Sequence, residues 1–330
     1  MRLFRTLLIF LLAAVLLLVA GTLWWWQRPL DLAADPVAVE IAPGSSARAT
    51  AQALHDAGVQ APALLLYAGF RLSGRSRAIK AGHYELDAGI TPQALLDRLV
   101  KGEQALVSLT LIEGWNFREL LQVVRNAPEL RQDLDGLGPA EIMARIGYPG
   151  VHPEGRFFPD TYRMVRGATA SSVLRQAAQS MDQRLAQAWT RRAPGAVVST
   201  PEQALILASI IEKETGTAAD RAMVGGVFNN RLRIGMRLQT DPSVIYGLGE
   251  RFDGNLRKAD LLADTPYNSY TRAGLPPTPI AMPGWASLLA AVQPAQTPAL
   301  YFVARGDGSS HFSASLAEHN AAVRRYQLQR

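Results

Sequence analysis

An unbroken apolar run opens the chain and differs from every later apolar segment. It extends from Leu7 to Trp26 with only a glycine and a threonine as interruptions. About 20 such residues in a helix span roughly 30 Å, the thickness of a bilayer core. Tryptophan indoles, which favour the headgroup region, occupy its last three positions. The pattern predicts a single transmembrane helix over residues 7–26.

The charges that flank this run predict its orientation. Arg2 and Arg5 precede it, and basic residues mark the cytoplasmic side of a span. Residues 1–6 are therefore expected to be a cytoplasmic tail and residues 27–36 a linker. The rest would lie in the periplasm, anchored in the cell inner (cytoplasmic) membrane. A cleaved signal peptide is the alternative, which the length of the run disfavours.

Short strands and helices are predicted after the linker. The alternating pattern predicts strands at 37–41 and 82–86. Apolar residues at helical spacing predict helices at 47–57 and 62–72. Thr91 and Pro92 open a further helix, as cap and first helical residue, and it ends at Lys101-Gly102. This order over residues 37–105 resembles a LysM-like module that binds glycan. A spacer without a ligand is the alternative.

The remaining chain, residues 106–330, mixes strands, helices and loops, and its last third is rich in loops. A strand is predicted at 107–112, helices at 117–126, 139–146 and 171–192, and a hairpin around the turn at 306–310, followed by a helix that contains His319. The fold class is therefore α+β.

Composition narrows the classes of function. Hydrophobic residues make up 48% and charged residues 19%, as in globular proteins. The net charge of +6 suits an anionic partner such as nucleic acid, a membrane surface or an acidic polymer, and export argues against nucleic acid. The absence of cysteine excludes disulfides, thiol catalysis and cysteine-ligated metals.

One helix carries candidate chemistry. Thr200 is a cap, a proline follows, and Gln203 is placed to complete a capping box. The apolar run 204–211 then meets Glu212-Lys213-Glu214-Thr215, before a stop signal at Gly216. A helix this apolar is normally buried, so two carboxylates at its end are unusual.

Helical geometry separates these carboxylates. Glu214 lies on the apolar stripe of Leu207 and Ile211, whereas Glu212 points about 200° away and could reach solvent or a structural partner. Lost hydration and the helix C-terminus would both raise the pKa of Glu214. A carboxylic acid that stays protonated near neutral pH can protonate a glycosidic oxygen. The alternative is a solvated face, which is common for Glu-Lys-Glu runs.

Four motifs then occur in order: Ala208–Thr215, Asn230–Pro242, Tyr267–Tyr270 and Gly274–Pro277. Together they closely resemble the endolytic murein transglycosylase family (MltG, or YceG-like), and the resemblance runs from about Val37 to the C-terminus. It implies a LysM-like module followed by a mixed α/β YceG-like catalytic domain at residues 106–330. The implied activity is lytic cleavage of the β-1,4 bond between N-acetylmuramic acid (MurNAc) and N-acetylglucosamine (GlcNAc), which leaves a 1,6-anhydro-MurNAc end. Glu214 matches the catalytic glutamate.

A single carboxyl is sufficient for this chemistry. A hydrolase normally needs two, but in a lytic transglycosylase the C6 hydroxyl of the sugar attacks within the same molecule. Glu214 would act first as acid and then as base. The five histidines have no metal-ligand spacing, so no metal and no cofactor are expected.

Aromatic, amide and carboxylate side chains around the motifs suit sugar binding. The candidate substrate-binding residues are Glu154, Asp160, Asn230, Gln239, Thr240, Asp241, Tyr246, Tyr267, Asn268, Tyr270 and His311. Asp160 could instead cap a turn, and His311 could pack. Arg231 and Arg237 could meet stem-peptide carboxylates, but surface ion pairing is the favoured role.

The expected substrate is the nascent peptidoglycan glycan strand, whose elongation the enzyme would terminate beside penicillin-binding proteins and glycan polymerases. Two alternatives stay open. The first is a non-enzymatic glycan-binding adaptor of the cell-wall synthesis machinery, and the second is an inverting or retaining muramidase.

Overall fold

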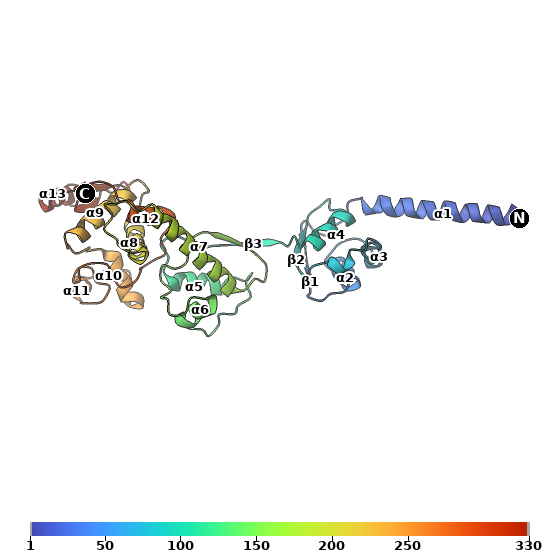
Figure 1. Cartoon of the computed structure of the whole chain (residues 1–330), viewed down its shortest axis with the longest axis horizontal. Helices are drawn as coiled ribbons and strands as arrows, with labels where there is room; N and C mark the ends of the chain where they lie inside the picture. Colours follow the sequence, from blue (N-terminus) through green and yellow to red (C-terminus); the bar gives the residue numbers. More distant parts are fainter. Residues whose placement is uncertain (1, 329–330) are drawn as a thin grey trace. The chain divides into compact units, whose positions relative to one another are not determined.

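A computed structural model of the chain describes residues 2–328 and has a mixed α+β fold. Met1, where the expected tail starts, lies outside the described residues. The helices are α1 (Arg2–Trp26), α2 (Ala47–Asp56), α3 (Ala63–Leu72), η1 (Ser76–Ala78), α4 (Pro92–Lys101), α5 (Phe117–Arg125), α6 (Pro139–Ile146), α7 (Ala170–Thr190), α8 (Pro201–Glu214), α9 (Arg221–Arg233), α10 (Asp241–Leu248), η2 (Gly249–Arg251), α11 (Lys258–Leu262), α12 (Trp285–Val292) and α13 (Leu316–Tyr326). Figure 1 labels most of these elements.

The strands form three two-stranded sheets. They are β1 (Val37–Ile41) with β2 (Gly82–Leu86), β3 (Leu106–Thr110) with β4 (Thr161–Val165), and β5 (Tyr301–Ala304) with β6 (Ser310–Ser313). The chain divides into two compact units. The first runs to Val107 and includes Arg163–Gly167, and the second contains Ser108–Tyr162 and the chain from Ala168 on.

The first unit begins with α1, in which Phe4–Trp26 is long and apolar enough to cross a membrane, as a signal sequence would also be. Next comes the antiparallel pair β1–β2, with Val37 opposite Leu86. Residues of β1 are alternately buried and exposed, which confirms the predicted strand. The buried face packs with α2, α3 and α4 into one core, against which Trp25 and Trp26 at the end of α1 also pack.

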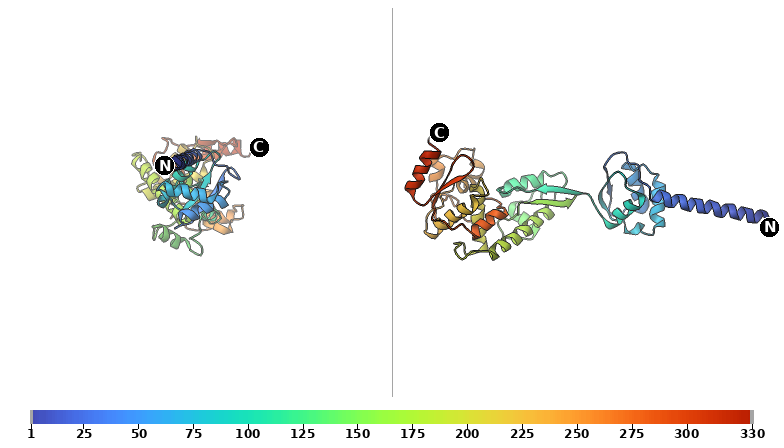
Figure 2. Two further views of the ribbon diagram at one scale, coloured as in Figure 1. Left: turned by 90° about the vertical axis from the view of Figure 1, so that its right-hand side faces the viewer. Right: turned by 90° about the horizontal axis from the view of Figure 1, so that it is seen from above.

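The core of the second unit surrounds α8. Every residue of α8 from Ala204 to Ile211 is buried, as the apolar run predicts, and α7, α9 and α12 pack around it. α9 and α12 come close because Gly225 has no side chain: a Cβ there would lie 2.5 Å from the carbonyl oxygen of Ala290. At the C-terminal end, α13 packs beside the β5–β6 hairpin (Figure 2).

The start of α8 differs in one detail from the prediction. Thr200 caps the helix, and its hydroxyl accepts from the N–H of Gln203 at 3.2 Å. The side chain of Gln203 accepts from the N–H of Ser199 at 2.8 Å rather than from that of Thr200. The predicted capping box is therefore wrong in its second half, because the amide reaches one residue further back.

Candidate active site

Glu214, the last residue of α8, lies at the junction between the core and a cavity. Its side chain is partly buried and lines a cavity of about 420 Å³. The helix reaches this point because its apolar body is fixed in the core, so its final turn emerges at a defined place. The cavity is lined by Glu214, Arg231, Gln239, Asp241, Tyr270, Tyr301, Phe302, Leu316, His319 and Asn320.

A buried threonine holds the Glu214 carboxyl. Thr240 Oγ1 donates to Glu214 Oε1 over 2.5 Å. The N–H of Thr240 donates to Ser269 Oγ at 2.9 Å, and the hydroxyls of Ser243 and Ser269 lie 2.8 Å apart. Two of the predicted motifs, Asn230–Pro242 and Tyr267–Tyr270, therefore meet at this carboxyl. The preceding residue, Gln239, has a positive φ of 48°, which is uncommon outside glycine and shows that the turn is tightly constrained.

The pKa of Glu214 is raised above its ordinary value, as predicted. Burial is the main cause, because it disfavours the charged form, and the neighbouring charge of Asp241 acts in the same direction. The hydrogen bond from Thr240 and the positive charge of Arg231 lower the pKa, but they do not cancel the effect of burial. Glu214 therefore keeps its proton to a higher pH than an exposed glutamate does.

Arg231 was expected on the surface, and that expectation is wrong. Its side chain is 7% exposed, and the guanidinium donates to the carbonyl oxygens of Leu300 at 2.7 Å and Leu238 at 2.6 Å. The group lies 5.4 Å from the ring centre of Tyr301 and faces the same cavity as Glu214. Arg231 therefore supplies a fixed positive charge beside Glu214, the carboxyl whose pKa is raised.

Tyr270 and Asp241 form a second polar pair in this cavity. The hydroxyl of Tyr270 donates to Asp241 Oδ1 at 2.6 Å. Asn268 does not reach the cavity lining. It is buried and donates to carbonyl oxygens of residues 260, 261 and 263, while its own oxygen accepts from the N–H of Tyr270 at 2.9 Å. Asn268 therefore shapes the loop that presents Tyr270.

Glu212 has a structural partner, one of the two environments predicted for it. Its carboxylate pairs with Arg221 at 3.2 Å and accepts from the N–H of Gly284 at 2.9 Å. The carboxylate of Glu212, on the helical face opposite Glu214, is therefore also shielded from water. The difference between the two glutamates is that Glu212 has a cationic partner in direct contact, whereas Glu214 faces a cavity.

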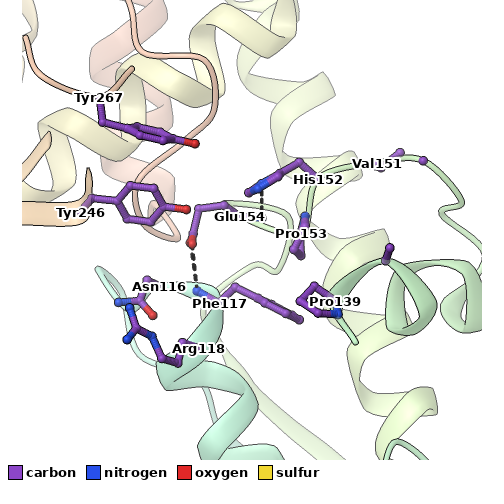
Figure 3. A pocket seen from close by; sticks show the side chains of 12 residues that line it. Asn116, Phe117, Arg118, Pro139, Val151, His152, Pro153, Glu154, Tyr246 and Tyr267 are labelled. Atoms are coloured by element: carbon purple, nitrogen blue, oxygen red, sulfur yellow. Dashed lines mark hydrogen bonds between the residues drawn. The ribbon is translucent and has the colours of Figure 1, made fainter. Parts of the chain in front are cut away.

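A second cavity of about 580 Å³ surrounds Glu154 (Figure 3). Only 3% of Glu154 is exposed, and its carboxylate oxygens accept from the N–H of Phe117, at the start of α5, at 3.0 and 3.2 Å. Burial raises its pKa to about 7, although this hydrogen bond and one with Tyr246 lower it. Tyr267 packs edge-to-face on Tyr246 with ring centres 4.8 Å apart.

α10 connects the two cavities. It begins at Asp241, which lines the Glu214 cavity, and it carries Tyr246, which lines the Glu154 cavity. Tyr246 follows Asp241 by five residues, which is about 7.5 Å along the helix axis. The sequence motifs therefore supply two neighbouring cavities, not one.

Three other candidates lie away from both cavities. Asn230 donates to the carbonyl oxygens of Thr297 and Ala299 at 2.7 and 3.0 Å. Asp160 is exposed, and its carboxylate accepts from the N–H of Thr161 at 2.7 Å, as a turn cap would. The ring of His311 packs against Tyr326, with ring centres 5.7 Å apart.

Sequence reasoning missed five residues from the C-terminal hairpin and helix that line the Glu214 cavity: Tyr301, Phe302, Leu316, His319 and Asn320. The rings of Tyr301 and His319 stack with centres 5.2 Å apart. His319 was placed on the closing helix, which the structure confirms as α13. Nothing in the spacing of these residues indicates that the hairpin brings them to Glu214.

Comparisons with known proteins agree on one family. The profile of the YceG-like family matches residues 39–325. An endolytic murein transglycosylase of Bacillus subtilis is 31% identical over 264 residues, which cover 75% of this chain and 73% of that protein. One of Streptococcus pneumoniae is 27% identical over 327 residues, 87% of this chain but only 58% of the pneumococcal protein. A crystal structure of a YceG-like protein from Listeria monocytogenes matches with a TM-score of 0.52 at 29% identity, over 87% of this chain and 99% of that one.

Proposed function

Because the chain belongs to the YceG-like family, we propose that it is a membrane-anchored lytic transglycosylase of peptidoglycan. Its substrate is the β-1,4 bond between MurNAc and GlcNAc in nascent glycan strands, and its product carries a 1,6-anhydro-MurNAc end. The observation that carries the proposal is the state of Glu214: a carboxyl with a raised pKa, held by Thr240 and facing a cavity.

Glu214 would perform both proton transfers. In the first step the protonated carboxyl gives its proton to the glycosidic oxygen as the bond from C1 to that oxygen breaks. In the second step the carboxylate takes the proton of the C6 hydroxyl, whose oxygen bonds to C1. Glu214 is then protonated again and no water is consumed. Attack within one sugar benefits from a high effective concentration.

The two cavities would bind neighbouring parts of the strand. Gln239, Asp241 and Tyr270 lie beside Glu214 and present polar groups to the sugars at the scissile bond. In the second cavity Tyr246 and Tyr267 present rings and Glu154 a carboxyl. Tyr246 lies about 7.5 Å further along α10 than Asp241. Asn230, Asn268 and Thr240 act by holding the loops and the Glu214 carboxyl.

The rest of the chain would place this site outside the cytoplasm, next to the membrane. α1 anchors it in the cytoplasmic membrane with the second unit in the periplasm, and residues 37–105 form a LysM-like module for glycan. Cutting nascent strands near the membrane would terminate their elongation beside penicillin-binding proteins and glycan polymerases.

A muramidase is the second candidate, and one observation favours it. Asp241 shares the cavity with Glu214, so a second carboxylate is present that could activate water or act as a nucleophile. The raised pKa of Glu214 does not distinguish the two reactions, since both need an acid.

Mass spectrometry of the products distinguishes these functions. The purified full chain is incubated with isolated sacculi, and the released muropeptides are weighed. The proposal expects anhydro ends, which are lighter than reducing ends by one water. Reducing ends would identify a muramidase, and no release, with glycan binding retained, would identify the adaptor.

A further inference from the structure

α3 is apolar on two faces. Leu66 and Phe70 are fully buried in the core of the first unit. On the other side, Leu64 is 73% and Leu72 81% exposed, and Leu65 and Ala68 lie between them. At about 100° per residue these four positions fall within an arc of about 100°. We call them the outer stripe. A helix that is apolar all round is normally buried on all sides or in contact with lipid.

The C-terminal end of α3 lies against α1. The ring of Trp26 occupies the space over Gly69, where a Cβ would lie 2.0 Å from a ring atom. Gly69, Leu72 and Ser73 line an apolar cavity of about 350 Å³ together with residues of α1 from Leu18 to Trp26. The exposed end of the outer stripe is therefore next to the apolar helix.

Helix geometry gives the depth of this contact. Leu18 precedes Trp26 by eight residues, which is about 12 Å along α1. If the tryptophans lie at the headgroup level, Leu18 is within the hydrocarbon. Because Leu72 shares a cavity with Leu18, the end of α3 reaches the edge of the hydrocarbon region.

The chain segment that forms this end carries only positive charges. Residues 62–80 contain four basic residues and no acidic one. Arg75 pairs with Asp97, but within residues 2–328 the side chains of Arg71 and Arg77 form no ion pair. The guanidinium of Arg28 lies 3.9 Å from the ring centre of Trp24, at the same end of α1. Basic groups at this level attract anionic phospholipid headgroups.

We propose that α3 is a membrane-docking helix. Its outer stripe enters the surface of the bilayer, and Arg71 and Arg77 contact anionic phospholipid headgroups. The first unit is then held on the membrane by two elements, α1 across it and α3 on it. This inference rests on the proposed anchoring by α1.

Site-specific quenching tests this proposal, because the chain has no native cysteine. An environment-sensitive fluorophore is attached to Leu72→Cys in the full chain, which is placed in nanodiscs of phosphatidylcholine and phosphatidylglycerol. Leu11→Cys on α1 and Gln52→Cys on the exposed side of α2 are the reference sites. Lipids with brominated acyl chains and aqueous acrylamide serve as the two quenchers.

The expected result is that the probe at position 72 behaves like the probe at position 11, quenched by lipid and shielded from acrylamide. Acrylamide quenching at 72 with lipid quenching at 11 would overturn the docking and leave the anchor intact. Shielding from both quenchers at 72 would also overturn it, because a protein partner or a second copy would then cover the stripe. A lack of lipid quenching at 11 would refute the anchoring itself.

A charge reversal tests the headgroup contact. With Arg71→Glu and Arg77→Glu together, lipid quenching at position 72 should fall by about twofold or more in the anionic discs. The matched control reverses two basic residues of α13, Arg324 and Arg325, and should leave quenching unchanged. Equal quenching in all three proteins would contradict the role of the two arginines.

Discussion

Glu214 is surrounded by groups that shift its pKa in opposite directions. Burial and Asp241 favour the protonated form, while Thr240 and Arg231 favour the charged form. A group that must act first as acid and then as base needs both forms within reach, so this balance suits the proposed double role.

Replacing Thr240 by valine should raise the pKa of Glu214 further, because the hydrogen bond that stabilises its charged form is lost. Because the acid must be protonated, kcat/KM falls as pH rises through that pKa. In a plot of kcat/KM against pH, the falling limb of Thr240→Val should therefore lie at higher pH than that of the wild type. Thr240→Ser keeps the hydroxyl and should keep the wild-type limb. Identical limbs in all three proteins would contradict the assigned acid.

Glu154 makes a separate prediction about stability. Folding raises its pKa from 4.5 to about 7, which corresponds to about 3 kcal/mol. The charged form is disfavoured in the fold, so this stability is present below about pH 4.5 and is lost as pH rises through 7. Relative to Glu154→Gln, the wild type should therefore lose about 3 kcal/mol between pH 4 and pH 8.

Thermal unfolding of both proteins across this pH range measures the difference. The exposed Glu250→Gln is the matched control and should parallel the wild type at every pH. A constant difference between wild type and Glu154→Gln would show that Glu154 is ionised normally.

Two kinds of sequence signal predicted residues of the site: helical periodicity for Glu214, and the four motifs for Gln239, Asp241 and Tyr270, which line the same cavity. Glu214 was identified because its face follows from counting along one helix. The buried role of Arg231 depends on the carbonyl oxygens of Leu238 and Leu300, which are far apart in sequence. The local sequence pattern around Arg231 contains no information about contacts with these carbonyl oxygens.

At the scale of elements, sequence and structure agree where amphipathic periods and caps are strong. The predicted strands at 37–41 and 82–86 and the helix at 139–146 have the observed bounds. α9 was not predicted. Its buried face has Val224, Val227 and Phe228 at helical spacing, but Gly225, Gly226, Asn229 and Arg231 are also buried and break the apolar pattern. Tertiary packing, not propensity, determines that helix.

The close approach of α9 to α12 gives a direct test. Gly225→Ala would place a Cβ 2.5 Å from the carbonyl oxygen of Ala290, a backbone atom that cannot rotate away. Overpacking of this kind costs about 1–3 kcal/mol, so the melting temperature should fall by several degrees. At Gly195 the nearest atom to a new Cβ is 4.0 Å away, so Gly195→Ala should melt like the wild type. Equal melting of both variants would contradict the packing.

At the scale of the whole molecule, the proposed function requires that everything after α1 lies outside the cytoplasm. A single cysteine at the exposed Gln52 should react with a membrane-impermeant maleimide in intact spheroplasts, because no other thiol is present. A cysteine at the exposed Arg237, in the second unit, should react equally. Labelling of either site only after lysis would contradict the predicted orientation.

The central claim is that one carboxyl, on Glu214, carries both proton transfers. Its most direct test compares wild type and Glu214→Gln for release of anhydro-ended muropeptides from sacculi, with thermal unfolding measured on the same samples. The claim predicts that release falls to background while the melting temperature and membrane association are retained. Anhydro release at the wild-type rate from a folded Glu214→Gln protein would contradict it.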